Sequence, residues 1–432
     1  MILRGTKIRL ELNNKQRTLA FQHAGVSRHA YNWGVNLCQE ISKIKGKLPS
    51  AIDMHKLLVR DVKSVNKWYY DVSKCSPQEA LRDLNKSWSN FFRQLKNGEV
   101  EKKKKSYIKE QKSKGLPINT KKLHNLCKPK FKKKGVNDSF YLSGTTTQII
   151  KIVGNKIKVP IFGWVKMSEY FDYKFTVKNV VISRTSDEWF ISFNRESSDL
   201  KIKNIHKKPT VGVDVGISTL ATMSDGSIFT SVKAYKKYKR KLKIAQRIVS
   251  KRFNENAKEQ SKNYQKAKTK VAKIHYKISC VRKDALHQLT SDLAKNHSLI
   301  GIEDLNVKGM MKNHKLAGAI ANGGFHEFRR QLEYKTKWYG SELVVIDRFF
   351  PSSKMCSCCG NIKKDLKLSQ RIYNCESCGM SLGRDLNAAI NIRNEAVSSI
   401  ATVCGEVRKS DIISETSTKQ KKNSKQPLGK FV

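Results

Sequence analysis

Apolar and polar positions alternate over residues 3 to 12, where Ile8, Leu10 and Leu12 stand against charged neighbours. A period of two predicts a β-strand with one buried face. The same alternation returns between residues 140 and 200, in 157–159, 175–177, 180–182 and 189–193, and residues 185–188 (Thr-Ser-Asp-Glu) fit a hairpin turn. We expect the first strand to pair with these later strands, so that residues 1–12 and 135–204 form a β-barrel interrupted by an insertion.

The insertion, residues 13–134, has the helical period. Asn13 and Asn14 are suited to cap a helix that begins near Lys15. Residues 76–79 (Ser-Pro-Gln-Glu) predict a capping box with proline at the first helical position. Gly98 predicts the end of that helix, and the apolar residues before it predict a core-facing stripe. The stripe consists of Leu81, Leu84, Trp88, Phe91 or Phe92, and Leu95.

Strands and helices alternate in the second half of the chain. Residues 209–229 predict strand, turn and strand, with Asp225-Gly226 as a hairpin signal. Residues 233–283 predict a helical hairpin packed along one apolar stripe, residues 325–339 predict a helix, and the apolar runs 299–302 and 343–346 are typical of buried strands. The polar segment after about residue 406 predicts a disordered tail. The fold class we expect is multidomain α+β.

Charge is the unusual feature of the composition, because 86 Lys and Arg against 36 Asp and Glu give a net charge of +50. A polyanionic partner accounts for this self-repulsion. A nucleic-acid backbone fits better than an anionic membrane surface, because no isolated basic amphipathic helix stands at a terminus. Residues 102–134 hold fourteen lysines and one acid, which predicts a solvated, mobile segment and is compatible with contact to phosphates.

Four of the ten cysteines form two C-x2-C pairs separated by fifteen residues, and a glycine follows each pair. These residues are Cys356, Cys359, Cys375 and Cys378. The spacing predicts a zinc site, and four thiolates make a closed site of structural type. Cys358 is an alternative ligand within the first pair. The remaining cysteines are scattered, which favours a reducing compartment. No signal peptide or membrane-spanning run is evident, so we expect a cytoplasmic protein.

Three acidic residues occupy comparable places in their elements. Asp214 lies in Val-Gly-Val-Asp-Val-Gly-Ile, Glu303 ends the strand Leu-Ile-Gly-Ile, and Asp385 lies in the first turn of a predicted helix, Arg-Asp-Leu-Asn-Ala-Ala-Ile-Asn. Ala388 and Ala389 are small enough for that helix to lie close on a sheet. The three carboxylates can therefore converge on one point.

Converging carboxylates repel one another unless a cation lies between them. Two Mg²⁺ or Mn²⁺ ions about 4 Å apart would remove the repulsion and promote hydrolysis of a phosphodiester. We interpret two other acids as structural. Asp304 should point to the opposite face of the strand from Glu303, and Asp225 belongs to a turn.

Together these motifs resemble those of TnpB, a family of transposon-encoded proteins of insertion sequences related to type V CRISPR effector nucleases. The resemblance covers the C-terminal half densely and the N-terminal half through organisation and charge. The residues that carry it are Gly212-Val-Asp-Val-Gly-Ile217, Ile302-Glu-Asp-Leu305, Phe328-Arg-Arg-Gln-Leu-Glu-Tyr-Lys335, Asp347-Arg-Phe-Phe-Pro-Ser-Ser-Lys354 leading into Cys356, and Arg384-Asp-Leu-Asn-Ala-Ala-Ile-Asn391.

The resemblance implies five parts. Residues 1–12 and 135–204 would be a β-barrel wedge domain, and residues 13–134 a helical recognition domain with a Lys-rich linker. Residues 205–350 and 384–402 would be a RuvC-like nuclease of RNase H fold with a helical insertion at 233–297. Residues 351–383 would be a zinc-ribbon module that binds target nucleic acid. The tail would be residues 403–432.

The resemblance also implies an RNA-guided DNA endonuclease that binds a guide (omega) RNA, one protein per RNA, and cuts double-stranded DNA beside a short motif. Asp214, Glu303 and Asp385 would be the catalytic ligands of Mg²⁺, and Cys356, Cys359, Cys375 and Cys378 the ligands of Zn²⁺. Base pairing would select the target sequence, so the protein needs a basic channel that reads duplex shape. Three alternatives stay open: a miniature CRISPR effector, a guide-dependent DNA-binding repressor, and a transposase that joins DNA ends.

Overall fold

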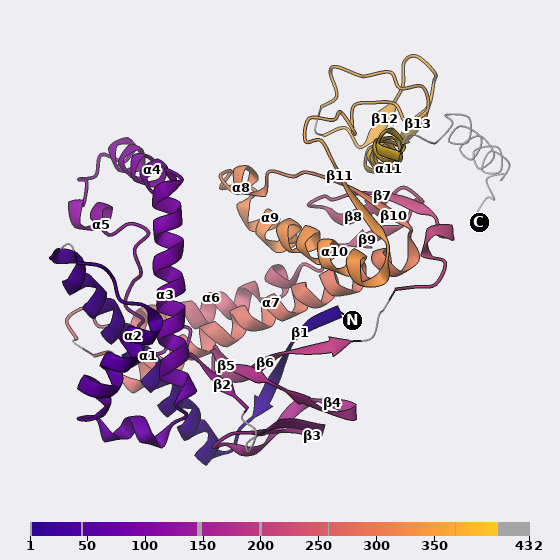
Figure 1. Ribbon diagram of the computed structural model, residues 1–432. Helices are drawn as coiled ribbons and strands as arrows, with labels where there is room; N and C mark the ends of the chain where they lie inside the picture. Colours follow the sequence, from indigo (N-terminus) through magenta and orange to yellow (C-terminus); the bar gives the residue numbers. More distant parts are fainter. Residues whose placement is uncertain are drawn as a thin grey trace. The chain divides into compact units, whose positions relative to one another are not determined.

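The computed structural model describes residues 2–44, 46–144, 149–197, 201–257, 259–367 and 369–404 (Figure 1). Most of the expected tail lies outside these residues. The chain divides into two compact units, residues 1–197 and 198–432. Within the described ranges, no helix is long and apolar enough to cross a membrane.

The first unit contains a six-stranded antiparallel sheet. Its strands are β1 (Ile2–Glu11), β2 (Ser139–Ser143), β3 (Ile150–Val159), β4 (Gly163–Val177), β5 (Asn179–Thr185) and β6 (Glu188–Ser197), in the order β2-β5-β6-β1-β4-β3. β1 pairs with β4 and β6, as the sequence predicted, and Thr185 pairs with Glu188 across the expected hairpin turn. Among the described residues no ladder joins the edge strands β2 and β3, so the sheet is a half-barrel.

Helices fill the insertion between β1 and β2. They are α1 (Asn14–Lys43), α2 (Ala51–Leu57), α3 (Cys75–Lys96), α4 (Glu99–Ser113) and α5 (Thr120–His124). The predicted cap of the first helix is confirmed: the Asn13 side chain accepts the N–H of Gln16, and the Gln16 side chain accepts the N–H of Asn13. Ala20 and Ala24 of α1 pack into the core of the sheet, so the insertion and the half-barrel share that core.

The predicted capping box at residues 76–79 is wrong. α3 begins at Cys75, and the Ser76 hydroxyl donates to the carbonyl oxygen of Tyr141 in β2 (3.1 Å). A tertiary partner has taken the hydroxyl that would have capped the helix. The apolar stripe is confirmed through Phe91, which is buried, but Phe92 and Leu95 are 48% and 45% exposed.

The Lys-rich segment is more ordered than its composition predicted, because it contains most of α4 and all of α5. It is also tied to α1. The Asn32 side chain accepts the N–H of Lys132 (2.7 Å) and donates to its carbonyl oxygen (3.0 Å), and the Lys132 ammonium lies 4.1 Å from the centre of the Tyr31 ring. The expectation of a mobile run is therefore wrong for these residues.

A five-stranded mixed sheet forms the centre of the second unit. Its strands are β7 (Thr210–Asp214), β8 (Thr219–Met223), β9 (Ile228–Thr230), β10 (Leu299–Glu303) and β11 (Glu342–Ile346), in the order β11-β10-β7-β8-β9. β7, β8 and β9 are antiparallel, whereas β7, β10 and β11 are parallel. The predicted hairpin at Asp225-Gly226 is confirmed: Gly226 has a φ of +90° and the Asp225 carboxylate accepts the N–H of Ser227.

The helices of this unit are α6 (Ala234–Arg252), α7 (Lys262–Asn296), α8 (Val307–Met310), α9 (Ala317–Gly323), α10 (Phe325–Tyr339) and α11 (Arg384–Cys404). α6 and α7 form the predicted helical hairpin, visible in Figure 1. Leu242, Ala245 and Ile278 of its predicted stripe are buried. The buried Lys335 of α10 donates to three oxygens of α7, which belong to His287, Thr290 and Ser291.

Two glycines let α11 lie directly on the sheet. Gly212 of β7 and Gly301 of β10 are register partners. A Cβ atom on Gly212 would lie 2.1 Å from the carbonyl oxygen of Ala389, and one on Gly301 would lie 2.8 Å from the Cβ of Ala396. Ala389 is fully buried, as the sequence predicted for a helix close to the sheet. The two glycines therefore fix where α11 crosses the strands.

Candidate functional site

The three acids come together because of the position of α11. Side chains two residues apart in a strand point to the same face, so Asp214 shares the face of Gly212, and Glu303 shares that of Gly301. α11 covers this face, and Asp385 lies in its first turn, one helical turn before Ala389. Asp214 and Glu303 end the neighbouring parallel strands β7 and β10.

Electrostatics confirm that the three carboxylates influence one another. Burial and, after it, the charges of Glu303 and Asp385 together raise the pKa of Asp214 to about 7. Arg384 and the N–H of Val215 act against this rise. The cluster thus contains uncompensated repulsion between negative charges, which a bound cation would relieve.

Three residues that support this site were not given a role from the sequence. The Ser352 hydroxyl donates to Oε1 of Glu303. The buried Asn391 amide of α11 donates to the carbonyl oxygen of Ser352 (2.7 Å). Asn387, one turn earlier and also buried, donates to the carbonyl oxygen of Met355 and accepts the N–H of Ser357. Two asparagines four apart on one helix were the available signal, because buried amides need partners.

Asp304 has the structural contacts that the sequence predicted for it. Its carboxylate accepts hydrogen bonds from Arg329 of α10 (2.6 Å) and from Arg348, which follows β11. These two guanidiniums hold the pKa of Asp304 below its usual value. Asp304 therefore ties α10 and the end of β11 to the residue beside Glu303.

The four predicted cysteines converge on a second site. Sγ of Cys356 lies 3.6 Å from Sγ of Cys378, and Sγ of Cys359 lies 3.5 Å from Sγ of Cys375. All four sulfur atoms lie within 4.8 Å of one another. Zn–S bonds of about 2.3 Å in a tetrahedron place sulfur atoms about 3.8 Å apart, so the donors fit zinc. Cys358 is exposed and outside the group.

Each cysteine pair is held by the same kind of turn. Gly360 and Gly379 have φ of +77° and +72°, and their N–H groups donate to the carbonyl oxygens of Cys356 and Cys375, both at 3.0 Å. The N–H groups of Cys378 and Ser377, together with the thiols of Cys359 and Cys378, lower the pKa of Cys375 to about 6. The short strands β12 (Ile372–Asn374) and β13 (Ser381–Gly383) flank the second turn. The thiolate of Cys375 is thus stabilised before any metal binds, whereas burial raises the pKa of Cys356 in the other turn.

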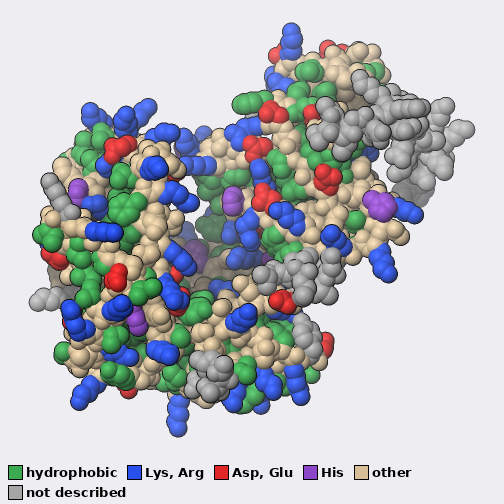
Figure 2. Space-filling model, in the orientation of Figure 1, with side chains coloured by type: hydrophobic (Ala, Val, Ile, Leu, Met, Phe, Trp, Pro, Cys, Tyr) green, Lys and Arg blue, Asp and Glu red, His purple; other side chains and the backbone are tan. Residues whose placement is uncertain are grey.

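The carboxylates are spread more widely than the sulfur atoms. Among the described His, Cys, Asp and Glu residues, the cysteines form the one group of three or more whose ligand atoms all lie within 4.8 Å. Figure 2 shows Lys and Arg side chains over much of the visible surface, outnumbering Asp and Glu. The structure therefore offers a soft-ligand group of four cysteines and, apart from it, three carboxylates that interact electrostatically.

Three family models match parts of the chain. Residues 195–314 match the IS605 OrfB family, described as a probable transposase. Residues 325–392 match a Cas12f1-like TNB domain. Residues 1–47 match the helix-turn-helix domain of IS605 OrfB proteins, although the described residues of this range form β1 and the single helix α1. The first two models contain all three acids and all four cysteines of the two sites.

Curated relatives agree with these models. InsQ of Escherichia coli K12, named as a candidate RNA-guided DNA endonuclease, is 29% identical over 94% of each chain. A Streptomyces pristinaespiralis protein named in the same way is 41% identical over 52% of this chain and 54% of its own length. Among solved structures, the mini-RNA-guided endonuclease CRISPR-Cas_phi3 has 12% identity over 92% of each chain. Its TM-score of 0.47 is too low to establish a shared fold.

Proposed function

Because this chain belongs to the TnpB family, the OrfB-type proteins of IS605-like insertion sequences, we propose that it is an RNA-guided DNA endonuclease. It binds a guide RNA made from its transposon, recognises a short DNA motif beside the target, and cuts DNA at the cluster of Asp214, Glu303 and Asp385. The observation that carries this proposal is the convergence of those three acids where α11 begins on the mixed sheet.

The acid cluster has the donor chemistry of a Mg²⁺ or Mn²⁺ site, since its ligands are oxygens. Burial, together with the charges of Glu303 and Asp385, raises the pKa of Asp214 to about 7. When bound, two such ions would activate water and stabilise the leaving oxygen of a phosphodiester. The Ser352 hydroxyl donates to the Glu303 carboxylate and so restrains its position. Asn391 in turn holds the backbone of Ser352, so α11 positions two of the acids at once.

The same sheet supports a finer fold assignment as part of this proposal. Three antiparallel strands followed by two parallel strands, with α11 across them, support a RuvC-like core of RNase H fold. The cysteine module interrupts this core between β11 and α11, and four thiolates with no open position support a structural Zn²⁺ site. The half-barrel and its helical insertion would serve as the wedge and recognition parts.

Substitution of each acid tests the proposal. We expect Asp214→Ala, Glu303→Ala and Asp385→Ala to lower the cleavage rate on the order of 1,000-fold or more, because losing about 4 kcal/mol of transition-state stabilisation has that effect. The protein is purified with its co-expressed RNA, the RNA is sequenced, and cleavage is measured on a target duplex flanked by randomised sequence. Guide and target binding are measured in parallel.

Asp225→Asn is the matched control, because it removes a carboxylate of the same unit from a turn. It should cut at the wild-type rate. Wild-type cleavage by any of the three acid variants would defeat the assignment. Intact target with wild-type protein, guide and Mg²⁺ would instead indicate a repressor. Strand transfer without added RNA would indicate a transposase, and a repeat array beside the gene would indicate a CRISPR effector.

A further inference from the structure

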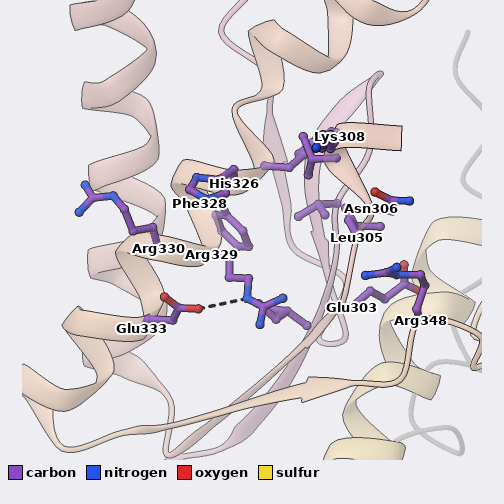
Figure 3. A pocket seen from close by; sticks show the side chains of 14 residues that line it. Glu303, Leu305, Asn306, Lys308, His326, Phe328, Arg329, Arg330, Glu333 and Arg348 are labelled. Atoms are coloured by element: carbon purple, nitrogen blue, oxygen red, sulfur yellow. Dashed lines mark hydrogen bonds and ion pairs between the residues drawn. The ribbon is translucent and has the colours of Figure 1, made fainter. Parts of the chain in front are cut away.

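A pocket of about 440 Å³ opens beside Glu303 in the second unit (Figure 3). One part of its wall is apolar and includes Leu305, Val307 and Phe325. Arg329 of α10 and Arg348 contribute guanidinium groups to the wall, and Arg330, which pairs with Glu327, also lines it. Val215, the neighbour of Asp214, also lines it. We call this cavity the arginine pocket. It borders the acid cluster but contains side chains that the cleavage chemistry above does not use.

The two guanidiniums are held in place by one carboxylate. Asp304 accepts a hydrogen bond from each, and the Arg348 Nε–H donates to its backbone oxygen (3.1 Å). Glu333 also pairs with Arg329 (3.1 Å). An arginine carries five N–H donors in a rigid plane, so each keeps donors beyond these contacts. Figure 3 shows Arg348 beside Glu303.

These features select a class of ligand. Guanidinium groups favour phosphate oxygens, which they bind in pairs of hydrogen bonds. The apolar wall favours a flat or aliphatic group next to that phosphate. The volume is within the range of about 300–1,000 Å³ typical of small-molecule sites, and it is too small for a duplex. A phosphate joined to a weakly polar ring system describes one unpaired nucleotide.

We propose that the arginine pocket binds one unpaired deoxynucleotide of the strand being cut, with a phosphate at Arg329 and Arg348 and the base on the apolar wall. This inference rests on the proposed function, since it supplies the substrate for the adjacent acids. Arg329 and Arg348 are substrate-binding residues. Asp304 is a positioning residue, because it holds both guanidiniums and does not itself reach the nucleotide.

Binding of a small probe tests the pocket without any cleavage. The probe is deoxythymidine 3′,5′-bisphosphate, titrated calorimetrically into the full-length protein without guide RNA or divalent ions, at a salt concentration that suppresses nonspecific contacts. We expect Arg348→Ala and Arg329→Ala each to weaken binding about tenfold, because a hydrogen bond to a charged group contributes that much. Arg348→Lys should recover part of the loss, since it restores the charge without the planar fork.

Arg252→Ala is the matched control. Arg252 is an exposed arginine at the end of α6 in the same unit, its guanidinium donates to the carbonyl oxygen of Asn263 (3.1 Å), and it does not line the pocket. It should change the dissociation constant by less than about twofold, because it lies outside the arginine pocket. Equal weakening by all three alanine variants would show a general charge effect and overturn the proposal. Unchanged binding in Arg329→Ala and Arg348→Ala would overturn it as well.

Asp304→Asn tests whether Asp304 positions the two arginines for binding or only stabilises the fold. It keeps the size of the side chain but loses the charge that holds both guanidiniums, so we expect weaker probe binding with an unchanged melting temperature. A lower melting temperature with wild-type probe binding would show that Asp304 is only structural. A failure of the proposed nuclease function can be distinguished from a failure of this proposal, because the probe experiment measures binding and not cleavage. Asp214→Ala should bind the probe normally, whereas in the guide-loaded protein Arg348→Ala should raise the KM for a single-stranded substrate more than it lowers kcat.

Discussion

The cysteine site and the acid site lie in the same unit but are built in opposite ways. The four cysteines span residues 356 to 378, and each pair is held by hydrogen bonds within its own turn. The acids span residues 214 to 385 and come from β7, β10 and α11. Their approach depends on Gly212 and Gly301, which admit α11 to the sheet. One site is a product of local turns, and the other is a product of packing.

This difference has consequences for stability and for chemistry. Turns that bring four cysteine sulfur atoms together make a site that a metal can close by itself. A cluster of partly buried carboxylates works against its own fold until a cation binds, as the raised pKa of Asp214 shows. The cysteine site should therefore tolerate damage to the sheet, whereas the acid site should be lost with small changes in helix packing.

Of the substitutions considered, Gly212→Ala should have the largest effect, and it should affect the acid site while leaving the cysteine site intact. The new Cβ would lie 2.1 Å from the Ala389 carbonyl oxygen and 2.3 Å from the Arg393 nitrogen, so α11 must move. We expect a loss of about 3 kcal/mol in the free energy of unfolding, at the upper end for overpacking, together with loss of cleavage. Denaturant unfolding measures the first, and zinc content by metal analysis should stay near the wild-type value.

Gly318→Ala is the control for this substitution. Gly318 lies in α9 with nothing within 4 Å of an added Cβ, and alanine favours a helix over glycine by about 1 kcal/mol. It should leave stability unchanged or slightly higher. If Gly212→Ala retains full stability and cleavage, then the close contact between Gly212 and α11 does not position Asp385. If it also loses its zinc, then the cysteine module depends on the sheet after all.

Cys375→Ser tests the other side of the comparison. It removes the thiolate whose pKa the backbone N–H groups lower to about 6, so the remaining three ligands should hold zinc weakly. We expect zinc content well below one ion per chain and faster amide hydrogen exchange over residues 351–383. Exchange in β7 and β10 should stay slow, because their core does not include the module.

Cys358→Ser is the matched control, since this cysteine is exposed and outside the cluster. Its zinc content and exchange should equal those of the wild type. Loss of zinc in Cys358→Ser would show that it replaces Cys359 as a ligand. A fully loaded Cys375→Ser protein would contradict the four-cysteine assignment.

The pH dependence of stabilisation by Mg²⁺ should be the smallest effect, and it tests the acid site. The pKa of Asp214 is raised to about 7, so protonation stabilises the metal-free fold, and this contribution is lost as pH rises from about 4 through 7. Mg²⁺ needs the ionised carboxylate. The rise in melting temperature on adding Mg²⁺ should therefore be greater at pH 8 than at pH 6. An equal rise at both values, or the same pH response in Asp214→Asn, would contradict the assignment.

The sequence predicted the structure correctly where the pattern of residues reflects a local turn or a strand with one buried face. The alternation around Ile8 and Leu10 predicted β1 and its later partners, and Asp225-Gly226 predicted a hairpin. It failed at Ser76, whose hydroxyl bonds to a carbonyl oxygen 65 residues away. It also failed in the Lys-rich segment, where Asn32 fixes the backbone of Lys132 from 100 residues away. No short window of sequence contains such partners.

The sequence by itself determined the cysteine site, because the spacing of two pairs and the glycine after each specify turns that need few distant contacts. It also singled out the three acids that we propose as the catalytic site, through their places at the ends of strands and the start of a helix. Only the tertiary structure decided that Ser352 holds Glu303, that Asn391 holds Ser352, and that Asp304 aims two arginines into a pocket. These contacts join residues 25 to 49 positions apart, and they exist because α10 and α11 pack on one sheet.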